Sequence, residues 1–95
     1  MKAIGIVEVV GVVASVRALD AMTKAASVEF KTSENSLGGR LVTIIVEGKV
    51  DDVISSVDVG IRVANTITKC VAHAVIPKPH EEVVALIEKS SKKYN

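Results

Sequence analysis

The chain has 95 residues, a formal net charge of +1 at pH 7 and a 48% share of apolar residues. This length predicts a single domain over residues 1–95, and so small a domain leaves much of its surface in water unless copies of it associate. With no dense basic stripe and only Phe30 and Tyr94 as aromatic residues, the chain is not expected to be a dedicated nucleic-acid-binding protein.

The first 26 residues predict a strand followed by a helix. Residues 3–10, AIGIVEVV, are apolar at nearly every position and end at Gly11, as a strand covered on most of its surface would. Apolar side chains then recur at steps of three or four, at Val12, Val16 and Leu19, with Ala26 further on. This spacing predicts an amphipathic helix with these residues on one face.

The next segment predicts two strands joined by a turn. Val28 and Phe30 alternate with charged residues in SVEFK, the pattern of a strand with one wet face. After the polar run KTSEN comes SLGGR, residues 36–40, and then the apolar run LVTIIVEG, residues 41–48. The adjacent glycines in SLGGR predict a turn between the two strands.

A second helix is predicted after residue 50. Asp51 and Asp52 are suited to cap a helix and to interact with its positive N-terminal end. The apolar face of this helix is expected to contain Val53, Val57, Ile61 and Ala64.

The last part of the chain predicts a strand and a short C-terminal helix. CVAHAVI, residues 70–76, reads as a strand that Pro77 and Pro79 stop. The following helix is expected to begin at Glu81 and Glu82, to bury apolar residues and to end in lysines. These residues are Val83, Val84 and Ile87, then Lys89, Lys92 and Lys93.

The order strand, helix, strand, strand, helix, strand predicts an α+β fold, the ferredoxin-like βαββαβ sandwich, with a short C-terminal helix. No low-complexity segment or close sequence repeat divides the chain.

The sequence holds little that predicts reaction chemistry. His73 and His80 are in no motif typical of a metal site or an acid–base pair, and the lone Cys70 is expected to be a small apolar group rather than a nucleophile. We therefore expect no enzyme activity, no metal and no cofactor. The apolar runs are too short to span a bilayer, no signal peptide opens the chain, and one cysteine fits a reducing cytoplasm.

Three segments together resemble the bacterial microcompartment shell family, single-domain and hexamer-forming. They are GIVEVVGVVASVRALDAMTKAASV, LVTIIVEGKV and HAVIPKPHEEV, and they cover nearly the whole chain. The resemblance implies a non-enzymatic structural protein whose cyclic hexamers tile edge to edge, with other shell proteins, into facets that enclose metabolic enzymes in the bacterial cytoplasm. The Pro-Lys-Pro-His motif looks closer to metabolosomes for ethanolamine or propanediol utilization than to carboxysomes.

The resemblance also implies a pore on the sixfold axis for small metabolites, lined by the turn between the second and third strands. The expected pore-lining residues are Ser36, Leu37, Gly38, Gly39 and Arg40. They depart from the family's usual Lys-Ile-Gly-Ser-Gly: Ser36 stands at the Lys position, Leu37 at Ile, Gly39 at Ser and Arg40 at the last Gly. Arg40 either faces the pore or pairs with Glu34 or Glu47. No cysteine occurs in this turn, so a cluster held there is not expected.

At the hexamer edge, the resemblance assigns Lys24 to the lysine that lies along the facing hexamer and Lys78 to the basic residue of a Pro-Arg-Pro-His motif. The edge set is Asp20, Lys24, Lys78 and His80. The alternative from the residues alone is that these lysines are solvated surface charges.

Two other function classes stay open. One is a ferredoxin-like small-molecule-binding regulatory module, and the other is a small enzyme with substrate residues at a subunit boundary. Either is expected to differ from a shell protein in assembly state.

Overall fold

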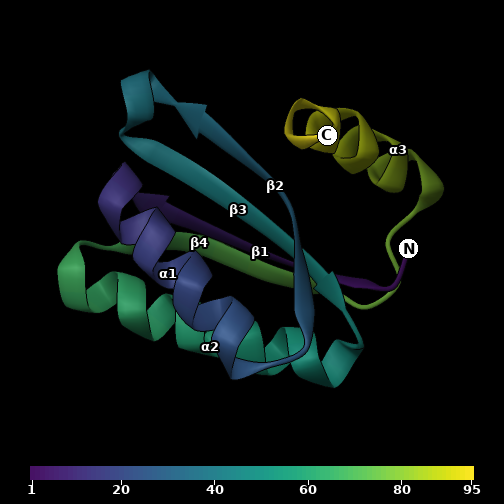
Figure 1. Cartoon of the computed structure of the whole chain (residues 1–95), viewed down its shortest axis with the longest axis horizontal. Coiled ribbons are helices and arrows are strands. Elements are labelled where there is room, and N and C mark those ends of the chain that lie inside the picture. The colour runs from purple at the N-terminus through teal and green to yellow at the C-terminus, as the bar shows by residue number, and fades with distance from the viewer.

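A computed structural model describes residues 1–95 and contains one four-stranded antiparallel sheet with helices on both of its faces (Figure 1). Its elements in chain order are β1 (Ala3–Val10), α1 (Val12–Ala25), β2 (Val28–Ser36), β3 (Leu41–Gly48), α2 (Val50–Ile67), β4 (Cys70–Ile76) and α3 (Glu81–Ser91). Short 3₁₀ turns span Leu37–Gly39 and Lys92–Tyr94. The predicted ferredoxin-like order with a C-terminal helix is confirmed.

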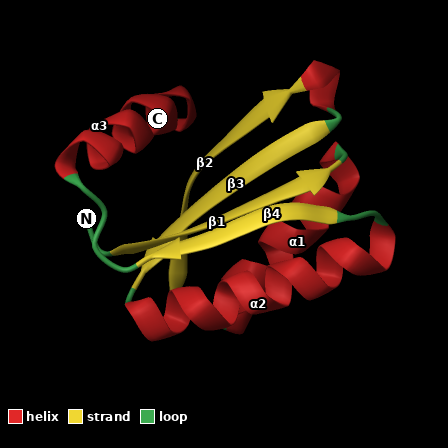
Figure 2. Cartoon of the chain, turned by 180° about the vertical axis from the view of Figure 1, so that it is seen from behind, coloured by secondary structure: helices red, strands yellow, loops and turns green.

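The strands lie in the order β2-β3-β1-β4, so β2 and β4 are the free edges of the sheet. Helices α1 and α2 pack together on one face, whereas α3 lies on the other face beside β2 (Figure 2). The three antiparallel ladders leave β1 and β3 fully paired in the middle.

The ladder registers define two ends of the sheet. Ser36 pairs with Leu41 and Leu41 with Val10, so β1 ends where β2 turns into β3; we call this the turn end. At the opposite end Gly48 pairs with both Ala3 and Val28, and β4 finishes there too, because Ile76 pairs with Ile4. Eight-residue strands separate the two ends by roughly 23 Å.

The core between the sheet and α1 and α2 consists mostly of valine, alanine and isoleucine, with Met22 the largest residue from α1. The strands contribute Val7, Val9, Val42, Ile44 and Val46, and α2 contributes Val53, Val57 and Ala64. The expected apolar face of α2 is therefore confirmed, with Ile61 packed at its margin.

The predicted inward face of α1 is wrong except at Leu19, which is half-buried and packs against the core. Val12 and Val16 are 48% and 59% exposed, and Ala26 lies just beyond the helix as its C-cap. The buried residues of α1 are Ala14, Ser15, Ala18 and Met22. These residues are mostly small because α1 lies close against α2, and the larger valines are left on the surface.

Two local expectations also change. Asp51 and Asp52 lie in the first turn of α2, whose N-cap is Lys49, so they act through the helix dipole and not as caps. Strand β2 continues through the polar run to Ser36, with an irregular register between Phe30 and Thr32. Its polar residues are compatible with a strand because β2 is an edge.

Candidate functional site

The turn after β2 is a tight left-handed connection. Leu37, Gly38 and Gly39 have φ values of 53°, 66° and 90°, and Arg40 returns to the right-handed region. The Gly11 N–H donates to the Arg40 carbonyl at 2.8 Å, which ties the turn to the start of α1. Glycine suits positive φ because it has no Cβ, and a Cβ at Gly38 would meet nothing within 4 Å.

Leu37 is the one non-glycine residue with positive φ, and the residue is 69% exposed. A leucine in this region is strained, so the turn holds an apolar side chain out in solvent at a conformational cost of about 1–2 kcal/mol. The chain itself offers no core contact that would explain this arrangement.

Arg40 is exposed, and both acids considered as its partners are occupied elsewhere. Glu34 binds Lys93 at 2.7 Å, while Glu47 lies 3.8 Å from Lys31 Nζ and accepts from the Lys2 backbone N–H at 3.0 Å. Arg40 forms no ion pair within the chain. Its guanidinium is therefore available to something outside this chain.

The edge set lies at the opposite end of the sheet. Lys24 and Asp20 form an exposed i,i+4 ion pair of 2.9 Å in the last turns of α1, about 18 Å along the helix from Val12. Lys78 is exposed in the segment that follows β4, which also ends at the opposite end. The structure thus separates the edge set from Ser36–Arg40 by the length of the strands.

His80 has a local role that the sequence analysis missed. It is the N-cap of α3, and its Nδ1 accepts from the Glu82 backbone N–H at 3.1 Å. This contact satisfies one of the free N–H groups at the start of the helix.

The sequence analysis also missed the contacts that hold the C-terminus on β2, which we call the C-terminal clamp. Tyr94 packs edge-on against Phe30 with ring centroids 5.0 Å apart, and its hydroxyl donates to the Ser33 carbonyl at 3.1 Å. Lys93 and Ser90 both donate to Glu34. The signal available in the sequence was that Phe30 and Tyr94 are its only aromatic residues.

The hydrogen bonds of Glu34 also affect its ionisation. Lys93 and Ser90, in that order of effect, lower the pKa of the Glu34 carboxyl from its ordinary value. Thr32 Oγ1 lies 2.7 Å from Ser90 Oγ, so the network continues into the buried part of β2. The clamp is therefore a connected set of polar contacts with one aromatic pair.

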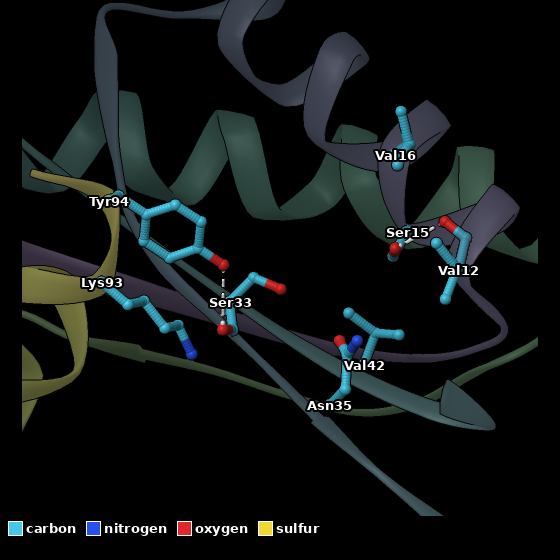
Figure 3. Close-up of a pocket in the computed structure, with 8 residues that line it drawn as sticks. All are labelled: Val12, Ser15, Val16, Ser33, Asn35, Val42, Lys93 and Tyr94. Atoms are coloured by element: carbon cyan, nitrogen blue, oxygen red, sulfur yellow. Dashed lines mark hydrogen bonds between the residues drawn. The ribbon is translucent and has the colours of Figure 1, made fainter. Parts of the chain in front are cut away.

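A cleft of about 400 Å³ lies between the clamp and α1 (Figure 3). Its walls include Val12 and Val16 from α1, Ser33 and Asn35 from β2, and Lys93 and Tyr94 from the C-terminus. It contains one amine and no arrangement typical of catalysis.

The cysteine, histidine and acidic side chains do not form a cluster that would carry reaction chemistry. Cys70 is half-buried, and burial raises the pKa of its thiol above the ordinary value. No group of three or more His, Cys, Asp and Glu residues is placed to hold a metal ion. No helix is long and apolar enough to cross a membrane.

The fold and these surfaces define a small α+β protein whose distinctive residues lie at the two ends of its sheet. The sequence pattern of the BMC domain matches residues 3–79. The chain is 39% identical to the bacterial microcompartment shell protein PduA of Citrobacter freundii, over 93% of this chain and 94% of that protein. It is 39% identical to the shell protein EutM of Salmonella typhimurium, over 87% of this chain and 85% of that protein.

Two further comparisons, with a carboxysome shell protein and with a solved structure, also match microcompartment proteins. The carboxysome shell protein CcmK2 of Synechococcus elongatus is 40% identical over 85% of this chain and 80% of its own length. The crystal structure of a microcompartment protein from Desulfitobacterium hafniense superimposes with a TM-score of 0.81 at 29% identity, covering 95% of this chain and 48% of that one, so this chain spans about half its length.

The chain belongs to the BMC domain family. Its relatives are microcompartment shell proteins, so it is a shell protein of this type and not an enzyme.

Proposed function

We propose that this shell protein forms cyclic hexamers that tile into the facets of a microcompartment, with a central pore for small metabolites. The observation that carries the proposal is the separation of two residue sets: Ser36–Arg40 lie at the turn end of the sheet, and Lys24 and Lys78 lie at the opposite end. In a ring with strands running outward from its axis, the turn end meets the axis and the opposite end forms the rim.

Ring closure is supported by the difference between the two edges of the sheet. The β2 edge is covered in part by the C-terminal clamp, whereas most of β4 is exposed. Two different edges favour heterologous contacts, in which one side of a copy binds the other side of the next, and such contacts form a ring when the rotation between copies closes. Partial burial of a small domain also favours assembly.

At the axis, six copies of the turn would surround the pore. Gly38 has open space around it and Arg40 has no acid partner within the chain, so backbone N–H groups and guanidiniums are both available there. We propose that Ser36, Leu37, Gly38, Gly39 and Arg40 line this pore and that it admits anionic metabolites preferentially.

At the rim, the edge set of Asp20, Lys24, Lys78 and His80 would face neighbouring hexamers, with Lys24 in contact with them and Asp20 paired to Lys24. The Lys24 stem can lie along an apolar neighbour while its amine reaches carbonyl oxygens. In this proposal other shell proteins share the facets, metabolic enzymes are enclosed, and the shell lies in the bacterial cytoplasm. The similarity to PduA and EutM supports an ethanolamine or propanediol compartment.

Sedimentation and electron microscopy of the purified chain test this function. We expect a particle of six 10.0 kDa chains that forms sheets or tubes when concentrated. A dimer or tetramer whose assembly responds to a small molecule would instead indicate a regulatory module.

A further inference from the structure

The turn end of the sheet combines exposed apolar side chains with cations that have no acid partner in the chain. Leu37 stands in the turn itself, which lies at the extremity of β2 and β3, clear of α2 (Figures 1 and 2), and Val10 at the end of β1 is exposed as well. Lys69 lies at this end too, because its carbonyl accepts from the Val10 N–H at 3.0 Å. Arg40 and Lys69 are both exposed, and neither takes part in an ion pair. This end therefore offers apolar surface and positive charge together.

The turn holds Leu37 and Arg40 in a fixed relation to each other. The Arg40 N–H donates to the Leu37 carbonyl at 3.3 Å, and the Arg40 carbonyl accepts from the Gly11 N–H at 2.8 Å. A Cβ at Gly39 would lie 3.5 Å from Val12 Cγ2, so the base of the turn rests against the start of α1. The base is thus anchored, and the leucine is presented beside the arginine on its outer side.

The stability of the chain does not explain a leucine at this position. Its φ of 53° is costly for a residue with a Cβ, and glycine or asparagine would adopt this conformation more readily. An apolar side chain that stays in water also gains nothing from burial. Strained residues of this kind are typical of functional sites. The combination points to a role for Leu37 in contact with something outside the chain.

We propose that Leu37 is the specificity-determining residue of the pore, and that the pore favours small anions carrying an alkyl group, such as short-chain carboxylates, over hydroxylated anions of equal charge. The inference rests on the proposed hexamer, in which copies of Leu37 surround the axis beside copies of Arg40. The guanidiniums attract any anion, so charge alone does not separate two monoanions. A ring of leucine side chains does, because it accommodates an alkyl group but gives a hydroxyl group no hydrogen-bond partner.

Isobutyrate and lactate are a matched pair of probes for this selectivity. Both are monoanions at neutral pH, and a hydroxyl group in lactate takes the place of one methyl group in isobutyrate. Through reconstituted layers of wild-type hexamers, and relative to free diffusion, isobutyrate should cross about threefold faster than lactate or more, because the hydroxyl loses water without a new partner. Leu37→Ser should bring the ratio of the two fluxes close to unity. Leu37→Met, which keeps an unbranched apolar side chain, should preserve the ratio.

Two further variants separate the leucine from its surroundings. Arg40→Gln should reduce the fluxes of both anions by the same factor and leave their ratio unchanged, because it removes charge and not apolar surface. Leu86→Ser makes the leucine-to-serine change at an exposed residue of α3, outside the turn, and should leave the ratio as in the wild-type chain.

A thermal measurement tests the strain of Leu37 without any pore. Leu37→Asn should raise the Tm by about 4 °C at fixed protein concentration, because asparagine adopts positive φ at a lower cost. Leu86→Asn, in the regular helix α3, should not raise it. Circular dichroism follows both transitions. A lower Tm for Leu37→Asn would show that the leucine stabilises the protein through contacts, and its assignment as a specificity residue would be wrong.

Sedimentation of the wild-type chain separates this inference from the proposed function. If no hexamer forms, the proposed function fails and the pore fails with it. If hexamers form but the two anions cross equally fast, or Leu37→Ser leaves their ratio unchanged, the inference is wrong while the hexamer stands. If Leu37→Ser speeds both anions by the same factor, Leu37 is a steric barrier without chemical preference, and the inference is wrong as well.

Discussion

Gly60 of α2 lies so close to Met22 of α1 that a Cβ at position 60 would come within 2.6 Å of Met22 Sδ and 2.8 Å of its Cγ. Met22 is fully buried, so the side chain has no free volume into which it can move. The close contact of the two helices depends on this glycine.

Gly60→Ala should therefore lower the free energy of unfolding by about 1–2 kcal/mol, because the overpacking cost exceeds the gain in helix propensity. In a Met22→Ala background the same change should become neutral or stabilising, since the clash is gone. Denaturant unfolding followed by circular dichroism at fixed protein concentration measures both. A loss of equal size in the two backgrounds would show that Met22 is not what the new methyl group meets.

The close contact of α1 and α2 also explains what the sequence could and could not predict. Strands β1, β3 and β4 are as predicted because runs of β-branched residues bounded by glycine or proline specify them locally. The inward face of α1 could not be predicted from apolar spacing, since small residues line the helix contact and Val12 and Val16 remain on the surface.

In the candidate sites, too, features set by neighbouring residues could be predicted and features set by distant contacts could not. The glycines of residues 36–40 do form a turn with positive φ, as a local signal can predict. The position of Lys24 and Lys78 at the opposite end depends on the strand registers, which are not local. The clamp joins Glu34 to Lys93 and Phe30 to Tyr94 across most of the chain, and no spacing rule predicts such pairs.

The clamp should loosen in acid. Lys93 and Ser90 lower the pKa of Glu34 in the folded state. The stabilisation that the ionised Glu34 gives to the clamp is therefore fully present at pH values above its ordinary pKa of 4.5. That contribution is lost as the pH falls through the lowered folded value. Tyr94 is the only tyrosine and there is no tryptophan, so tyrosine emission reports its release from Phe30.

Glu34→Gln should remove this acid-induced step and leave Tyr94 more mobile at neutral pH, because the charge that holds Lys93 is gone. Glu29→Gln, an exposed change on the same strand, is the control and should keep the step. An unaltered pH profile in Glu34→Gln would assign the step to a different carboxyl group.

In the proposed assembly, Lys24→Ala should spare the hexamer and sharply reduce sheets. The residue is exposed and pairs only with Asp20 within the chain, an interaction of about 0.3–0.5 kcal/mol, so the fold loses little. A small loss per contact is multiplied over a lattice. Sedimentation measures whether hexamers remain, and electron microscopy of the same preparation measures whether they form sheets. Undiminished sheets would remove Lys24 from the rim, and monomers would show that the rim is wrongly placed.

Asp20→Asn gives a prediction of opposite sign. Since Asp20 holds Lys24 at 2.9 Å, removing its charge should free the amine for a neighbouring hexamer. We expect sheets at lower protein concentration than for the wild-type chain, measured by light scattering. Weaker sheets would mean that Asp20 itself contacts the facing hexamer or positions Lys24 for it.

If the chain forms the proposed hexamer, Arg40 should set the charge selectivity of its central pore. Glu34 and Glu47 are bound to lysines, so no acid of the same chain neutralises it, and a hexamer would repeat it six times around one axis. Two such charges about 10 Å apart repel by roughly 0.4 kcal/mol in water, which solvent and salt tolerate. The resulting field attracts anions and disfavours cations, and the Gly38 and Gly39 N–H groups add donors.

Arg40→Glu should therefore reduce the flux of an anionic probe through reconstituted hexamer layers more than that of a neutral probe of equal size. Lys2→Glu makes the same charge change at the opposite end of the sheet and should leave the ratio of the two fluxes unchanged. Equal effects of Arg40→Glu on both probes would mean that Arg40 shapes the turn without selecting charge.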